Sequence, residues 1–200
     1  MSFITEKFSS FDIKTISDIG YGLDDHLFDI NDYKNKEKKF YLFEPNIFLF
    51  KDLIVKFKDF DNVCLYNYGI YNDNKIVNFY LDHYWSFIEG INAPIYANQK
   101  NNIERILKFH KVLINAYKIS VFDKGNIDFL SLSCEGCEWF CLEHLVSRPK
   151  IIRINNFNNS GYNNFFQKNI EKWIKENNYV LDFIENPVDC YYDYFYIKKE

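Results

Sequence analysis

Residues 127–133 place the strongest constraint on what this chain can fold into. They read IDFLSLS, a near-continuous apolar run, and a segment with a helical pattern follows at residues 135–146. A strand this apolar is expected at the centre of a sheet that is covered on both faces. Covering both faces requires strands and helices to alternate along the chain, so the predicted fold class is α/β.

The rest of the chain shows this alternation. The pattern predicts further strands at residues 13–19, 39–44, 63–68, 76–81, 112–121, 151–155, 179–184 and 191–197. It predicts further helices at residues 23–33, after Pro45 and at 165–177. The last two strands have no helix between them and should pair antiparallel. We therefore predict a doubly wound, mostly parallel seven-stranded sheet with an antiparallel C-terminal strand, in one domain spanning residues 1–200. Residues 82–102 are irregular and are predicted to form a loop or lid.

The charge balance of the chain argues against nucleic acids and membrane surfaces as partners. The 24 basic and 28 acidic residues give a net charge of −4, whereas proteins that bind nucleic acids or membrane surfaces normally carry a net basic charge. The sequence shows neither a membrane-spanning apolar stretch nor a signal peptide. With five cysteines, an odd number, reduced thiols and a cytoplasmic location are expected. Aromatic residues make up 20% of the chain, which is compatible with a homodimer.

The first candidate site is the turn after the first predicted strand, which contains Asp18, Gly20 and Gly22. Glycines allow the backbone to turn tightly and to approach a ligand. The start of the following helix offers free N–H groups to a negatively charged group. Taken alone, the pattern fits an ordinary strand-to-helix turn equally well.

Glu44, at the end of the second predicted strand, changes this balance. It follows Gly20 by 24 residues, and an acidic side chain at such a place can accept hydrogen bonds from both hydroxyls of a ribose. The two features together favour a cofactor that contains a nucleoside. Asp25 stands where a dinucleotide site needs glycine or alanine, and with Asp24 it would repel a pyrophosphate. S-adenosylmethionine, which is cationic and has no phosphate, therefore fits better than NAD.

The segment IDFLSLSCEGCEW, residues 127–139, resembles the hallmark of the FkbM-type methyltransferases, in which a strand ends in D-x-E-G-x-E. Glu135, Gly136 and Glu138 match this hallmark. The DxGxG turn and the tripeptide FEP at residues 43–45 also match in order and spacing. Residues 62–70 are similar to a weaker third block of the family, and the resemblance covers about residues 13–155.

The resemblance implies a Rossmann-like class I methyltransferase fold that uses S-adenosylmethionine. Gly20 and Gly22 would approach the methionine part of the cofactor, and Asp18 would hold the turn. Glu44 would bind the ribose, and Asn67 or Tyr68 would lie near the adenine. The expected reaction is O-methylation of a sugar, glycan or similar small metabolite.

The resemblance also implies that Glu135 lies near the transferred methyl group. Two positions depart from the family pattern, because Ser133 and Asn155 stand where the family has or often has an acidic residue. Methylation of a hydroxyl needs a general base or strict positioning. Glu135, Glu138 and His83 are the candidates to replace the missing carboxylate, with Glu135 expected at the site and His83 as the base, and Ser133 is the third candidate catalytic residue beside these two. The alternative for His83 is a loop histidine that makes a local hydrogen bond. The alternative function is a degenerate methyltransferase fold that serves as a binding or structural module.

A metal site is the competing interpretation of the same segment. Cys134, Cys137, Cys141 and His144 are four potential zinc ligands within 11 residues. Cysteines are equally suited to pack a helix against a sheet as small buried residues. We favour the packing role and predict no metal ion.

Overall fold

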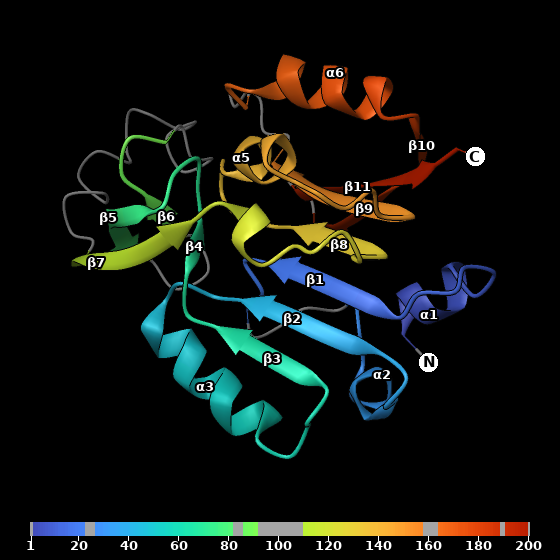
Figure 1. The fold of residues 1–200 in the computed structure, drawn as a ribbon, viewed down its shortest axis with the longest axis horizontal. Helices are drawn as coiled ribbons and strands as arrows, with labels where there is room; N and C mark the ends of the chain where they lie inside the picture. The colour runs from blue at the N-terminus through green and yellow to red at the C-terminus, as the bar shows by residue number, and fades with distance from the viewer. Residues whose placement is uncertain are drawn as a thin grey trace.

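The computed structural model describes residues 2–22, 27–81, 86–91, 110–157, 164–188 and 191–199. Within these residues, seven strands form one large sheet (Figure 1). The strands are β1 (Thr15–Ile19), β2 (Lys39–Phe43), β3 (Val63–Tyr66), β8 (Phe129–Leu132), β9 (Ile151–Phe157), β10 (Tyr179–Val188) and β11 (Tyr191–Lys198). Their spatial order is β10-β11-β9-β8-β1-β2-β3.

The order of the strands reverses between β1 and β8. The chain first runs from β1 outward to β2 and β3, then crosses back to β8 and continues to β9 on the other side. β1 pairs parallel with both β2 and β8, whereas β11 pairs antiparallel with both β9 and β10. This confirms the predicted doubly wound, mostly parallel sheet. Ligands of such sheets bind at the carboxyl ends of the strands, next to the point of reversal.

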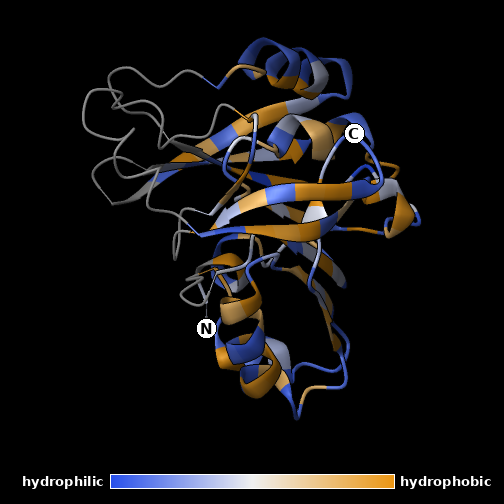
Figure 2. Ribbon diagram, turned by 90° about the vertical axis from the view of Figure 1, so that its left-hand side faces the viewer, coloured by the Kyte–Doolittle hydropathy of each residue, from blue (hydrophilic) through white to orange (hydrophobic). Residues whose placement is uncertain are grey.

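Helices cover both faces of the large sheet, as the apolar central strand requires. They are α1 (Phe3–Lys7), α2 (Ile30–Lys34), α3 (Ile47–Phe57), α5 (Glu138–Glu143) and α6 (Gln167–Glu176). One core contains Ile16 and Phe129 of the sheet together with Leu53 of α3. The core on the opposite face contains Leu130 of β8 and Leu142 of α5. All four residues of β8 are buried, and the apolar residues of the strands are visible in Figure 2. No described helix has the length and apolar composition needed to cross a membrane.

A second, four-stranded sheet lies on the carboxyl-end side of the large one (Figure 1). It contains β4 (Gly69–Ile70), β5 (Lys75–Leu81), β6 (Phe87–Ile88) and β7 (His110–Tyr117), and the short helix η2 (Ile119–Val121) follows it. Val77 and Ile88 of this sheet share a core with Cys137 and Phe140 of the α5 region. The small sheet therefore packs against the turn that leads from β8 into α5. The strand predicted at residues 76–81 is confirmed. The one predicted at 112–121 is confirmed only as far as Tyr117, because residues 119–121 form η2. The sequence did not predict that the two strands form a separate sheet.

Two helix predictions were too long. Residues 27–29 are not helical, and α2 begins only at Ile30. Asp29 caps this start, because its side chain accepts from the backbone of Asp32 while the Asp32 side chain accepts from the backbone of Asp29. The helix predicted at residues 135–146 is limited to α5, because the residues before it form a turn.

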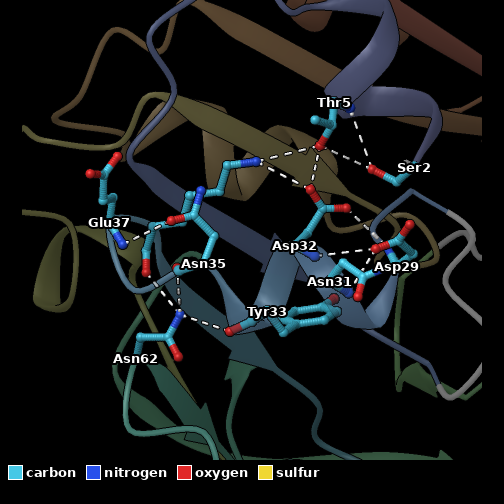
Figure 3. Close-up of polar contacts among 10 residues, drawn as sticks. Ser2, Thr5, Asp29, Asn31, Asp32, Tyr33, Asn35, Glu37 and Asn62 are labelled. Carbon is cyan, nitrogen blue, oxygen red and sulfur yellow. Dashed lines mark hydrogen bonds and ion pairs between the residues drawn. The ribbon is translucent and has the colours of Figure 1, made fainter.

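Buried polar contacts fix the segments around α2 (Figure 3). The hydroxyl of Thr5 in α1 donates to the carboxylate of Asp32, which is 6% exposed. Asn62, just before β3, donates from its side-chain nitrogen to three backbone carbonyl oxygens at 2.9–3.2 Å, those of Tyr33, Asn35 and Lys38. These contacts join α1, α2 and the turn before β2 into one rigid unit.

Candidate functional site

The strand register brings five of the positions singled out in the sequence to one edge of the large sheet. Ile19 is the partner of Phe43 and of Leu132, Phe43 is the partner of Tyr66, and Leu132 is the partner of Ile154. The residue that follows each of these strand positions therefore lies at the same carboxyl edge. These residues are Gly20, Glu44, Asn67, Ser133 and Asn155.

The turn at Gly20 is set by the close approach of two strand ends. Gly20 has a positive φ of 81° and donates its N–H to the carbonyl oxygen of Phe43 at 2.9 Å. A Cβ atom at this position would collide with the carbonyl oxygen of Ser133 and would lie 2.8 Å from its carbonyl carbon. At Gly22, no described atom lies within 4 Å of the position that a Cβ would take. Glycine at position 20 is therefore required by the protein's own backbone, whereas no described atom requires glycine at position 22.

Glu44 follows β2 directly and is only 5% exposed. Its Oε1 atom accepts from the backbone N–H of Asn46 at 2.7 Å. The side-chain nitrogen of Asn67 donates to the carbonyl oxygens of Glu44 at 2.8 Å and of Pro45 at 3.1 Å. Burial raises the pKa of Glu44 from its ordinary 4.5 to about 7, although the Asn46 hydrogen bond partly opposes this rise. A buried carboxyl group that half ionises near neutral pH thus lies beside the Gly20 turn.

This buried carboxyl should make stability depend on pH in a defined direction. Between pH 4.5 and about 7 the folded protein holds a proton on Glu44 that the unfolded chain has lost, so stability falls as pH rises through this window and is constant above it. We expect Glu44→Gln to remove this loss and to make the protein roughly 2–4 kcal/mol more stable than wild type at pH 8. Urea unfolding at pH 5 and pH 8 measures the effect, and an equal pH dependence in both proteins would contradict it.

The turn between β8 and α5 carries two further carboxyl groups. Glu138 is 4% exposed and accepts from the N–H of Gly136 at 3.2 Å and from the side chain of Asn164 at 3.1 Å. Glu135 is half-buried and has a positive φ of 49°, which ends any helical run at this point. Burial, and then the charge of Glu138, raise the pKa of Glu135 to about 8; burial also raises the pKa of Glu138. Glu135 can therefore give up or accept a proton close to neutral pH.

The cysteines of this turn have the features of packing residues. Burial raises the pKa of the Cys134 and Cys137 thiols well above their usual range, so both stay neutral. Cys141 is fully buried in the core between α5 and the sheet, and His144 lies 3.7 Å from Glu143. Among the described residues, no three His, Cys, Asp or Glu side chains form a group that could hold a metal ion.

The sequence analysis did not predict a buried ion pair that lies next to this edge. Arg153 of β9 donates to Asp193 of β11 at 2.9 Å and to the hydroxyl of Ser131 at 3.0 Å, and Asp193 is fully buried. The side chain of Asn155 donates to the other oxygen of Asp193, also at 2.9 Å. Each of these two residues is a single charged residue within an otherwise uncharged strand segment, IIRIN for Arg153 and YYDYF for Asp193. Two such charges of opposite sign were the only signal of a buried ion pair in the sequence.

Of the other predicted site residues, the structure describes Asp18 and Tyr68 but not His83. Asp18 is 1% exposed within β1, where it is the register partner of Ser131. The ring of Tyr68 stacks on Phe122 with 5.8 Å between centroids. His83 lies outside the described residues, as do Asp24, Asp25 and most of the predicted lid at 82–102.

Comparisons with known proteins establish the fold. No protein-family model matches the sequence, and no curated protein matches it either. The methyltransferase FkbM from Methylobacillus flagellatus has a similar structure, with a TM-score of 0.55 and 12% identity over 93% of this chain, which spans 44% of that protein. A proposed RNA methyltransferase from Pyrococcus horikoshii gives a TM-score of 0.52 and 11% identity over 99% of this chain and 81% of its own. The chain has the Rossmann-like fold of the class I methyltransferases.

Proposed function

We propose that this protein is an S-adenosylmethionine-dependent methyltransferase of the FkbM type that methylates a hydroxyl of a sugar, a glycan or a similar small metabolite. The observation that carries the proposal is the position of Glu44. It is a buried carboxyl group at the carboxyl end of β2, next to the Gly20 turn that ends β1, in a sheet with the class I methyltransferase order. The likeness to solved methyltransferases supports the fold on which this position depends.

The residues at the carboxyl edge fit the parts of the cofactor. The ionised carboxylate of Glu44 accepts hydrogen bonds from the ribose hydroxyls. The space beside Gly22 admits the methionine part, and Asn67 and Tyr68 at the end of β3 border the adenine. The carboxyl groups of Asp18, Glu135 and Glu138 lie at or next to this edge, and a cation bound beside them would favour their ionised forms. Bound S-adenosylmethionine supplies a methyl group on a positively charged sulfur.

The turn after β8 fits the acceptor side. Glu135 is half-buried at this turn and has a positive φ. The nearby Glu138 is held by the hydrogen bond that it accepts from the N–H of Gly136. Glu135 would take the proton of the acceptor hydroxyl, and the cofactor would supply the methyl group that this oxygen accepts. Ser133 precedes this turn and orients the hydroxyl. His83, the base expected from the sequence, lies outside the described residues and is the alternative base.

A second candidate function is a binding or structural module without catalysis. It is favoured by one observation, the absence of a carboxylate at positions 133 and 155. The side chain of Asn155 is engaged with Asp193 and offers no base. A non-catalytic module could still bind the cofactor, so cofactor binding alone does not distinguish the two candidate functions. Methyl transfer does, and the experiments below therefore measure both binding and transfer.

Calorimetric titration with S-adenosylhomocysteine tests the proposal. We expect micromolar binding by the wild type that strengthens about tenfold from pH 6 to pH 8, because Glu44 must ionise to accept the ribose hydroxyls. Glu44→Ala should abolish binding. Glu89→Ala is the matched control, since Glu89 is a surface carboxylate held by Lys111 and Tyr80 on the small sheet. A wild type that does not bind would contradict the proposed function.

The acceptor is tested with the same preparation. Labelled S-adenosylmethionine and a panel of monosaccharides and oligosaccharides should yield methylated product with the wild type, and Glu135→Gln should lose most of this activity while still binding S-adenosylhomocysteine. Methylation of RNA in place of sugars would overturn the acceptor class. Binding without transfer to any acceptor would favour the non-catalytic module.

A further inference from the structure

Glu138 is held by hydrogen-bond donors from two different elements. One oxygen of this buried carboxyl group accepts from the backbone N–H of Gly136 at 3.2 Å. The other oxygen accepts from the side-chain nitrogen of Asn164 at 3.1 Å. Gly136 belongs to the turn before α5, whereas Asn164 lies just before α6, which packs against α5 (Figure 1). The hydrogen bond from Asn164 therefore joins the start of α6 to the turn that carries Glu135.

The orientation of the Asn164 amide is fixed by the backbone. Its Oδ1 atom accepts from the N–H of Phe166 at 2.9 Å, and its carbonyl oxygen accepts from the N–H of Gln167, also at 2.9 Å. The ring of Phe166 packs edge-on against Phe140 of α5, with 5.0 Å between the centroids. Because the amide oxygen is already engaged, the NH2 group must face Glu138. An NH2 group can only donate, so Asn164 favours a Glu138 oxygen that carries no proton.

The neighbouring carboxyl group of Glu135 has a different environment. Within the described part of the chain, it is influenced by burial and then by the charge of Glu138, and together they raise its pKa to about 8. Burial raises the pKa of Glu138 as well, but hydrogen bonds from the backbone and from Asn164 oppose this rise. Two coupled carboxyl groups ionise one after the other, and the one that accepts the hydrogen bonds ionises first. The remaining proton of the pair therefore stays on Glu135.

Most other titratable groups around this pair are neutral. Burial raises the pKa of the nearby thiols above their usual range, and these are the thiols of Cys134, Cys137 and Cys141. Tyr71, which follows β4 of the small sheet, faces Cys137, and burial raises the pKa of its phenol too. Asp123, which follows η2, acts on Cys141, and its carboxylate accepts hydrogen bonds from Ser147. The segment before α6 contributes the uncharged Asn164 and Phe166.

We propose that Asn164 is a positioning residue, which holds Glu138 in its ionised form and so leaves the last proton of the pair to Glu135. This arrangement gives Glu135 the basicity that removal of a proton from a hydroxyl group requires. The role of Glu135 as the base rests on the proposed function. The division of charge between the two carboxyl groups rests on the contacts alone.

NMR spectroscopy of isotope-labelled glutamate side chains follows the ionisation of each carboxyl group and needs no substrate. The signals are assigned by their disappearance in Glu135→Gln and Glu138→Gln. In the wild type, Glu138 should ionise at a lower pH than Glu135. Asn164→Asp keeps an oxygen for the N–H of Phe166 but turns a second carboxylate oxygen toward Glu138. The order should then reverse, with Glu138 ionising at least one pH unit higher than in the wild type and Glu135 ionising at a lower pH.

Gln167→Glu is the matched control. Gln167 donates to Glu171 at 2.9 Å on the exposed side of α6, so the variant makes the same change from amide to carboxylate on the same helix. Glu135 and Glu138 should ionise in this variant as they do in the wild type. Asn164→Ala, which adds no charge, should raise the pH at which Glu138 ionises by about one unit. Circular dichroism confirms that each variant is folded.

The pH dependence of methyl transfer is the second measurement. The rate of the wild type should rise with a midpoint of about pH 8, and Asn164→Asp should move this midpoint to lower pH, which a loss of structure alone would not do. Unchanged ionisation of Glu138 in both Asn164 variants, or an equal change in Gln167→Glu, would overturn the proposal. Reversed ionisation in Asn164→Asp without methyl transfer by the wild type would contradict the proposed function and support the role of Asn164.

Discussion

Gly20→Ala is expected to lower the free energy of unfolding by about 3–5 kcal/mol. The added methyl group would collide with the carbonyl group of Ser133. Both colliding groups belong to the backbone, and both strand ends are fixed. Gly20 donates to the carbonyl oxygen of Phe43, and the N–H of Ser133 donates to that of Ile19, both at 2.9 Å. The positive φ of Gly20 adds strain for any residue with a Cβ atom.

Gly22→Ala is the matched control for this effect. It lies two residues further along the same turn, has no positive φ, and has no described atom within 4 Å of the added Cβ. Its free energy of unfolding should stay within about 0.5 kcal/mol of the wild type. Chemical denaturation of the two variants measures the difference, and equal stability of Gly20→Ala and Gly22→Ala would show that the strand ends can separate.

Arg153→Met should destabilise the protein by a similar amount, about 3–5 kcal/mol. The variant leaves Asp193, which is fully buried, without the guanidinium that lies 2.9 Å from its carboxylate. Removing one partner of a buried ion pair costs much more than the pair itself contributes, because the remaining charge has lost its water and its counter-charge. Denaturation in urea at pH 7 measures the loss.

The double variant Arg153→Met with Asp193→Asn separates this cause from a loss of packing. It removes both charges and leaves an amide next to Asn155, so most of the lost stability should return. Asp61→Asn serves as the surface control. It breaks the exposed ion pair with Lys36 and should cause no measurable change. A double variant as unstable as Arg153→Met would show that packing around residue 153 causes the loss.

Runs of apolar residues in the sequence predicted the large sheet, because its central strands are apolar on both faces. The run at residues 127–133 correctly gave β8 a central position, and the strand ends at Gly20, Glu44 and Ser133 then had to meet at one edge. The length of α5 could not be predicted in the same way. The positive φ angles of Glu135 and Gly136 keep the helix from starting before Glu138, and these backbone angles are not visible in the sequence.

Long-range contacts account for what the sequence did not predict. β5 and β7 pair from Lys75 with Ala116 to Leu81 with His110, across an intervening segment without a clear pattern. Arg153 and Asp193 are 40 residues apart, and each alone appears as a misplaced charge in an apolar strand. Asn155 departs from the acidic residue that the FkbM resemblance implies. The structure places the carboxylate of Asp193 directly across from it on the neighbouring strand.

The collision at Gly20 also affects how related sequences should be interpreted. The protein's own backbone excludes every other amino acid at this position, whether or not a ligand ever binds beside it. A lineage that abandoned methyl transfer and kept the fold would therefore retain this glycine, and its presence is no record of activity. No described atom demands glycine at position 22, and the buried carboxyl group of Glu44 lowers stability at high pH. Drift at these two positions would therefore distinguish descendants that use a cofactor from those that inherited only its scaffold.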